Sequence, residues 1–150
     1  MKKPVNKIET ILPRVLNKIT LCVYPMTTIK PEVTDITGLD NYNLVDQTRF
    51  DKNTAKLIIA FIARLPPPIC LVAHNGNLYD CTLIKAEMEK VDMQFSHDIL
   101  CADSYLGIKS LLRRTQDKPK SFSLVNLYNH LLGAFPAKSH GAEEDCLALL

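Results

Sequence analysis

Residues 69–80 read ICLVAHNGNLYD, and this stretch decides the fold. Residues 69–73 are apolar without alternation, which is typical of a short strand buried on both faces of a sheet. A buried helix has a similar composition, but the three prolines at 66–68 would stop a helix arriving from upstream. The turn at 74–77 leads to Asp80, which can cap or open a helix. An acid after a buried strand is also where open α/β sheets place their chemistry, although a helix cap alone is the simpler explanation.

The composition describes one domain of an ordinary globular kind. The chain has 150 residues, of which 47% are hydrophobic and 23% charged, and its net charge of +2 does not by itself indicate a nucleic-acid partner. Its five cysteines are an odd number without a C-x-x-C pair, and three of them lie in or beside apolar runs, which suits buried free thiols in a reducing compartment. No apolar stretch approaches the ~20 residues of a membrane span, and no long apolar segment follows the basic N-terminus. We therefore expect a cytoplasmic or nuclear protein without a membrane segment.

The patterns around the central stretch predict an α/β domain. Residues 17–24 alternate apolar and polar side chains, which predicts a half-buried antiparallel strand at a sheet edge, where a second copy could pair with it. Residues 26–49 are polar and rich in turn formers. Residues 53–65 have apolar side chains at helical spacing, with Asn53 as a possible cap. Helices that alternate with buried strands along the chain are typical of an α/β domain.

The second half of the sequence continues this alternation of helices and strands. Residues 81–91 predict a helix and 99–102 a second buried strand, after which Asp103 or Ser104 can cap another helix. Two further helices are expected. The first begins at Ser121 or Ser123 and ends before Gly133, and the second, at 138–150, has Ser139 as a possible cap and acids in its first turn. The connector at 113–120, RRTQDKPK, suits a phosphate-contacting loop and a solvated linker equally well.

Three side chains could form a metal site with a general base. Asp80 follows one strand, and His140 and Asp145 flank the start of the last helix. Two carboxylates from different elements can hold Mg²⁺ or Mn²⁺, and a neighbouring imidazole can accept a proton from water. The spacing alone is a weak signal, because most α/β proteins carry acids at helix starts.

Two motifs at these residues resemble one family. LVAHNGNLYD, which contains Asp80, and SHGAEEDCLALL, which contains His140 and Asp145, resemble the second and third exonuclease motifs of the three-prime repair exonucleases. Those enzymes belong to the DnaQ-like, ribonuclease H-fold group that uses four acids and a histidine. The similarity covers about residues 14–150, including LNKITLCVYP, DITGL and KSFSLVNLYNHLLG. It implies an α/β, ribonuclease H-like exonuclease fold with a mixed sheet flanked by helices.

The resemblance also assigns roles to individual residues. Asp80 and Asp145 are similar to the third and fourth metal-binding acids, which in the family share two Mg²⁺ or Mn²⁺ ions, and His140 is similar to the general base. Tyr79 and Ile36 fall where the family contacts the terminal nucleotide.

His74 and Asn75 would lie beside the strand end that receives DNA. An aromatic and an apolar side chain can stack on any base. Packing under the turn explains Tyr79 equally well, however, and a place in the core explains Ile36 better.

The sequence departs from the family pattern at its beginning. Active members open with a strand bearing Asp-x-Glu, whereas none of the ten aspartates here has glutamate two positions later. Residues 1–13 are an uncertain segment in which Lys7 and Glu9 replace that pair, and 14–150 are expected to be a partial exonuclease domain without its first strand or C-terminal end. A partial gene product or splice form explains this most simply, and a degenerate paralogue is the other possibility.

The function implied is metal-dependent 3′-to-5′ hydrolysis of nucleotides from single-stranded or frayed DNA 3′ ends, with the chain alone inactive or nearly so. The alternative is a catalytically dead nucleic-acid-binding or dimer-partner module, with a homodimer formed through the 17–24 strand. A small-molecule α/β protein ranks last, because the chain has only five glycines and no G-x-G phosphate loop.

Overall fold

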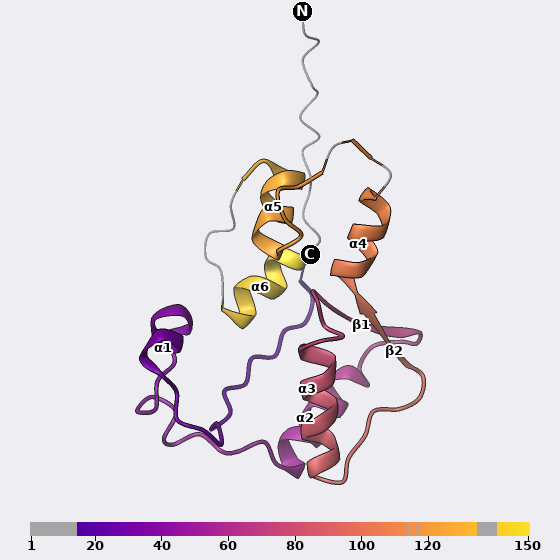
Figure 1. The fold of residues 1–150 in the computed structure, drawn as a ribbon. Coiled ribbons are helices and arrows are strands. Elements are labelled where there is room, and N and C mark those ends of the chain that lie inside the picture. Colours follow the sequence, from indigo (N-terminus) through magenta and orange to yellow (C-terminus); the bar gives the residue numbers. More distant parts are fainter. Residues whose placement is uncertain (1–14, 114, 117, 135–140) are drawn as a thin grey trace, which may run out of the picture.

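The computed structural model describes residues 15–113, 115–116, 118–134 and 141–150, and the chain in these ranges forms helices around a short parallel sheet (Figure 1). In chain order the elements are α1 (Pro31–Thr37), α2 (Lys52–Ile62), β1 (Ile69–Ala73), α3 (Asp80–Lys90), β2 (Ile99–Asp103), α4 (Ser104–Leu112), α5 (Leu124–Leu132) and α6 (Ala142–Leu149). The predicted uncertain segment 1–13 and the proposed cap Ser139 lie outside these ranges.

The two predicted core strands are present and parallel. β1 covers the predicted residues, and β2 extends one residue beyond its prediction, with Ile69 opposite Ile99 and Ala73 opposite Asp103. Helix α3 makes the crossover between them, as a parallel pair requires. The register places the carboxyl ends of both strands side by side, so the turn after β1 meets the start of α4.

The expectation that β1 is buried on both faces is wrong. Val72 is 53% exposed and Leu100, on the neighbouring strand, is 56% exposed. This face of the two-stranded sheet is therefore open to solvent at both residues. An apolar sequence can therefore predict a strand correctly without specifying what covers it.

The predicted antiparallel strand at 17–24 is also absent, and with it the mixed sheet among the described residues. This segment is extended, and the Tyr24 N–H donates to the Thr48 carbonyl at 2.8 Å. Alternating side chains give a segment one apolar face, but a strand also needs the backbone groups of a partner. The segment instead reaches α6 through an ion pair between Lys18 and Glu143.

Helix α2 begins and ends slightly earlier than predicted. Its cap is Asp51, whose carboxylate accepts the Thr54 backbone N–H at 2.8 Å and the Thr54 hydroxyl at 2.9 Å, rather than the predicted Asn53. The helix ends at Ile62, a turn before the prolines that were expected to stop it. An acid that can accept the backbone N–H three residues later, as Asp51 does from Thr54, therefore marks the start of this helix better than Asn53 does.

Helix α1 lies within the segment that was expected to contain only turns. Pro31 opens it and Gly38, at φ 72°, closes it in the left-handed conformation. This pairing of an opening proline with a closing glycine is a helix signal that is easily overlooked when the helix has only seven residues. Figure 1 shows α1 standing apart from α3 and the sheet.

The remaining predicted helices are confirmed, but the core that they form is small. Asp103 caps α4 and Ser123 caps α5, which Gly133 closes at φ 69°. Among the described residues, the buried apolar side chains are Leu44, Ala55, Ile62, Met88 and Leu127. Leu83, on α3, is 63% exposed. The prediction that the cysteines are free is confirmed, and the prediction that they are buried is wrong. No helix within the described ranges is long and apolar enough to cross a bilayer.

Candidate functional site

A carboxylate at the end of β2 organises the turn that follows β1. Asp103 accepts the backbone N–H of Asn75 at 2.9 Å, of Asn77 at 3.2 Å and of Tyr105 at 3.0 Å. Desolvation by burial acts to raise the pKa of Asp103, but the backbone N–H groups of Asn77, Asn75, Leu106 and Tyr105 outweigh it and lower that pKa. The ionised Asp103 therefore joins the turn 74–79 to the start of α4.

His74 ties the same turn to two further parts of the chain. Its Nδ1 lies 2.9 Å from the Ser104 hydroxyl and its Nε2 lies 2.8 Å from the Phe122 carbonyl. A carbonyl can only accept, so Nε2 donates its hydrogen to Phe122, and in the neutral ring Nδ1 accepts from Ser104. Both ring nitrogens are thus engaged within the protein, which makes His74 a positioning residue for this strand end.

The turn then delivers Asp80 to the start of α3 with its side chain uncommitted. Asp80 is the first residue of the helix, and neither it nor Tyr79 at the cap position makes a side-chain capping bond. The Asp80 carboxylate is exposed, and it forms no hydrogen bond or ion pair with any residue that the structure describes. The simple explanation of Asp80 as a helix cap is therefore not realised, and the carboxylate can meet a ligand.

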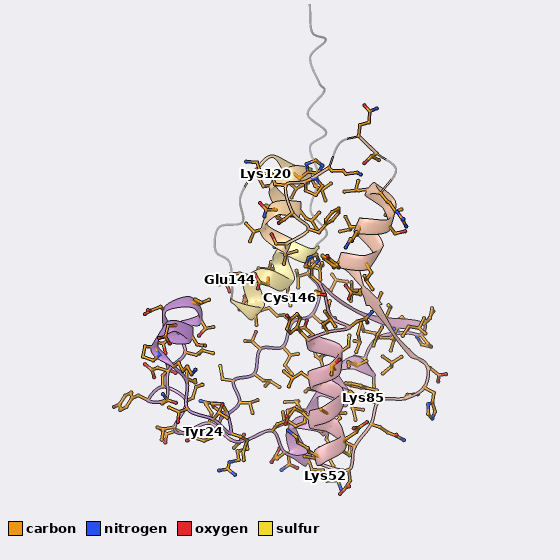
Figure 2. All side chains as sticks on the ribbon, in the orientation of Figure 1. Tyr24, Lys52, Lys85, Lys120, Glu144 and Cys146 are labelled. Atoms are coloured by element: carbon orange, nitrogen blue, oxygen red, sulfur yellow. The ribbon has the colours of Figure 1, made fainter. Side chains whose placement is uncertain are left out.

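Asp145 approaches the same region from α6. It lies in the first turn of that helix, and its backbone N–H donates to the Gly141 carbonyl at 2.9 Å. Desolvation by burial raises the pKa of the neighbouring Cys146 thiol, and the carboxylates of Asp145 and Asp80 raise it further. Two acids 65 positions apart in the sequence thus act on one thiol. Figure 2 shows Cys146 where α6 comes close to α3.

A cavity of about 720 Å³ opens beside these residues. Asp80 and Cys146 line it together with apolar side chains of β1, β2 and α3, among them Val72 and Met88. The cavity places a charged group at the border of an apolar space, an arrangement in which charges interact more strongly than in water.

The donors in this region match a hard divalent cation in kind but not in number. Carboxylate oxygens are the ligands that Mg²⁺ and Mn²⁺ favour, and Asp80 and Asp145 supply them. Among the described residues, however, no group of three or more His, Cys, Asp or Glu side chains is placed to hold a metal ion. The predicted base His140 lies outside the described ranges.

The residues expected to contact a nucleotide lie on separate elements. Tyr79 is 65% exposed beside Asp80, so it is not packed under the turn, and Ile36 is 57% exposed on α1, so it does not lie in the core. Asn75 adopts a left-handed conformation at φ 62°, which asparagine tolerates, and its backbone N–H is bound to Asp103. The structure thus gathers Tyr79, Asn75 and Asp80 on one turn and leaves Ile36 on α1.

The sequence pattern predicts Asp103 or Ser104 only as a helix cap and assigns no role to Phe122. The signal for Asp103 was present, because an acid that ends one parallel strand lies next to the turn that follows its neighbour. The Phe122 carbonyl carried no signal, since any residue type offers the same backbone oxygen.

Comparison with known proteins identifies relatives along most of the chain. The chain is 42% identical over 144 residues to three-prime repair exonuclease 1 of Homo sapiens, an alignment that covers 91% of this chain and 46% of that protein. It is 41% identical to the Bos taurus protein of the same name, over 92% of this chain and 46% of the relative. Three prime repair exonuclease 2 of Mus musculus is 34% identical over 93% of this chain and 62% of its own length. A scan against protein-family models finds no match.

The chain is similar along nearly its whole length to the three-prime repair exonucleases. The predicted resemblance is thereby confirmed over nearly the whole sequence. The chain spans about half the length of the three-prime repair exonuclease 1 relatives that it matches.

Proposed function

We propose that this chain carries part of a metal-dependent 3′-to-5′ DNA exonuclease centre on a ribonuclease H-like fold. The observation that carries the proposal is that Asp80, on α3, and Cys146, the residue after Asp145 on α6, line one cavity. Similarity to the three-prime repair exonucleases gives those acids a chemical purpose. In the complete centre the reaction is hydrolysis of the terminal phosphodiester at a single-stranded or frayed DNA 3′ end.

Asp80 and Asp145 would hold Mg²⁺ or Mn²⁺. When bound, the ion neutralises charge on the scissile phosphate and lowers the pKa of a water molecule. Asp80 suits this role because its carboxylate is exposed at the amino end of α3, where the helix dipole also favours an anionic phosphate. His140, as the general base, would accept the proton of the attacking water.

The turn 74–79 would position the DNA. Tyr79 presents an exposed ring one residue before Asp80, so a base stacked on it would bring its phosphate towards that carboxylate. Asn75 offers a side-chain amide on the same turn. His74 and Asp103 would act through the turn, because their hydrogen bonds fix it to α4 and to Phe122.

The shortage of ligands favours a chain that binds DNA without turning it over, inactive or nearly so by itself. The sequence has no Asp-x-Glu pair, and the described residues supply no third metal ligand beside Asp80 and Asp145. The alternative function, a catalytically dead nucleic-acid-binding or dimer-partner module, fits the same observation. The exposed basic residues Arg113, Lys118 and Lys120 would supply salt-dependent phosphate contacts to such a module.

Digestion of a single-stranded DNA labelled at its 5′ end, with Mg²⁺ present, tests the proposed activity. We expect the 150-residue chain to give no more shortened product than its Asp145→Ala variant. Digestion by the unchanged chain that disappears in Asp145→Ala would overturn the proposed inactivity and establish the chain as an enzyme. Salt-dependent DNA binding without digestion, measured by fluorescence anisotropy, supports the binding module. Absence of both binding and digestion would contradict both functions.

A further inference from the structure

A second concave surface lies beside α3, next to the turn 74–79. It is a groove of about 520 Å³ whose lining comes from the turn and from the helix: Asn77, Cys81, Thr82, Lys85, Ala86 and Glu89. Cys81, Lys85 and Glu89 also line the cavity of about 720 Å³ that Asp80 borders. Each of these three residues follows the last by four positions, so they form one stripe along α3. The groove and the cavity therefore meet along this stripe.

Lys85 is the uncommitted cation at this meeting place (Figure 2). Among the described residues that line the two spaces, it is the one lysine or arginine. Its ammonium lies 3.9 Å from the Glu89 carboxylate, which is close enough for an ion pair but too long for a hydrogen bond. Both side chains are largely exposed, so the pair is held weakly. The Lys85 ammonium therefore keeps its N–H donors for a ligand.

Asn77 adds a neutral donor from the turn. Its backbone N–H is bound to Asp103 and its carbonyl accepts the Thr82 hydroxyl at 2.8 Å, so the residue is fixed to both β2 and α3. Its side-chain amide is exposed and makes no hydrogen bond with any residue that the structure describes. None of the described residues that line the groove is aromatic. An ammonium and an amide in such a groove suit a phosphate rather than a base.

We propose that this groove binds a second phosphate of the DNA strand whose scissile phosphate lies at Asp80, with Lys85 as its main contact. The inference rests on the proposed function, which places the strand end at Asp80. Lys85 follows Asp80 by five residues, or about 7.5 Å along the helix axis, which is roughly two nucleotide steps of about 3.4 Å. Glu89 opposes the contact, because its carboxylate repels a phosphate and competes for the same ammonium.

DNA binding by charge variants tests the inference. The probe is a short oligo(dT) with a 5′ fluorescein and a 3′-terminal phosphorothioate that resists hydrolysis, and anisotropy is measured with Mg²⁺ over a series of salt concentrations. Lys85→Gln should weaken binding at low salt by roughly three- to tenfold and reduce the salt slope by about 0.7, the contribution of one single-strand phosphate. An oligo(dC) probe should show the same loss, because a phosphate contact does not distinguish bases.

Replacement of Glu89 gives the opposite sign. Glu89→Gln should strengthen binding, because it releases the Lys85 ammonium and removes a repelling charge. Much of this gain should disappear when Lys85→Gln is added, since the two side chains act on the same phosphate. A gain of equal size with and without Lys85 would show that Glu89 acts only by general repulsion, and that result would overturn the inference.

Glu87 and Lys90 form the matched control pair. They lie on the same helix and are joined by a hydrogen bond, and neither lines the groove or the cavity. Glu87→Gln and Lys90→Gln make the same charge changes and should alter the affinity by less than about twofold. Equal losses in Lys85→Gln and Lys90→Gln would overturn the inference, as would unchanged binding in Lys85→Gln, and either result leaves the proposed function standing. Absence of DNA binding by the unchanged chain would overturn both.

Discussion

The carboxylate of Asp103 accepts the backbone N–H of Asn75 at 2.9 Å, which joins the end of β2 to the turn after β1. The same carboxylate accepts the N–H groups of Asn77 and Tyr105. One side chain therefore sets both the turn that carries Asp80 and the first turn of α4. The geometry of the candidate site rests on this acceptor more than on the small apolar core.

Replacement of Asp103 by alanine should destabilise the protein by about 1–3 kcal/mol, because three backbone donors lose their acceptor. Urea unfolding followed by circular dichroism measures the loss. Asp35→Ala is the matched control, since Asp35 is an exposed aspartate on α1 and accepts no side-chain hydrogen bond among the described residues. Equal free energies of unfolding in the two variants would show that the hydrogen bonds to Asp103 do not stabilise the protein.

The same carboxylate predicts a loss of stability in acid. The pKa of Asp103 in the folded protein lies below its ordinary value of 3.8, so its contribution is complete above that value and is lost as the pH falls through the lower, folded value. Urea unfolding at about pH 6 and at about pH 3 should therefore show a larger acid-induced loss in the unchanged chain than in Asp103→Asn. A loss of equal size in both proteins would assign the acid sensitivity to other groups.

Elements that local chemistry determines could be predicted from the sequence, whereas features that depend on a partner could not. The run at 69–73, the cap Asp103 and the closing Gly133 each carry their own signal, and the structure confirms all three. The strand at 17–24 failed because pairing depends on a second backbone that alternation does not reveal. The burial of β1 failed for the same reason, since the covering elements are specified elsewhere.

The candidate site was predictable to a similar extent. Asp80 could be placed after β1 because an acid that follows a strand and a turn is visible in the sequence. The absence of a capping hydrogen bond from the Asp80 side chain could not be predicted, because it depends on how that side chain is oriented. The double engagement of His74 was equally hidden, since one of its partners is a backbone carbonyl 48 residues away.

Gly76 should not tolerate a side chain. A Cβ added there would lie 2.6 Å from the Ala73 Cβ and 3.2 Å from the Cys81 sulfur. We expect Gly76→Ala to cost about 1–3 kcal/mol of unfolding free energy, because either β1 or the first turn of α3 must shift. Gly107→Ala is the control, since nothing lies within 4 Å of an added Cβ on α4, and it should stabilise the helix by about 0.5–1 kcal/mol. A Gly76→Ala variant with an unchanged free energy of unfolding would refute this close packing.

His74→Ala should loosen the segment before α5. The variant loses the hydrogen bonds to Ser104 and Phe122, so we expect a stability loss of about 1–2 kcal/mol and faster amide hydrogen exchange at 121–123. His97→Ala serves as the comparison, because His97 is an exposed histidine without a hydrogen bond among the described residues. Unchanged amide hydrogen exchange at 121–123 in His74→Ala would show that His74 does not hold this segment in place.

The open face of the sheet should promote self-association. Leu100 is 56% exposed on a strand whose neighbour presents Val72, which is 53% exposed, on the same face. Leu100→Thr keeps a residue that favours strands and should raise the concentration at which light scattering first detects oligomers. Leu111→Thr, on α4, should change that concentration less. A larger effect of Leu111→Thr than of Leu100→Thr would show that the protein does not self-associate through the sheet face.

Manganese binding by the unchanged chain and by the Asp80→Asn, Asp145→Asn and doubly substituted variants tests the central claim most directly. Electron paramagnetic resonance reports the free ion, and Asp98→Asn serves as the control. If one ion is shared, each single substitution should weaken binding by roughly tenfold or more, and the double substitution should weaken it by less than the product of the two. Binding that is unchanged in both single variants, or that falls by the full product, would show that Asp80 and Asp145 do not hold a common cation.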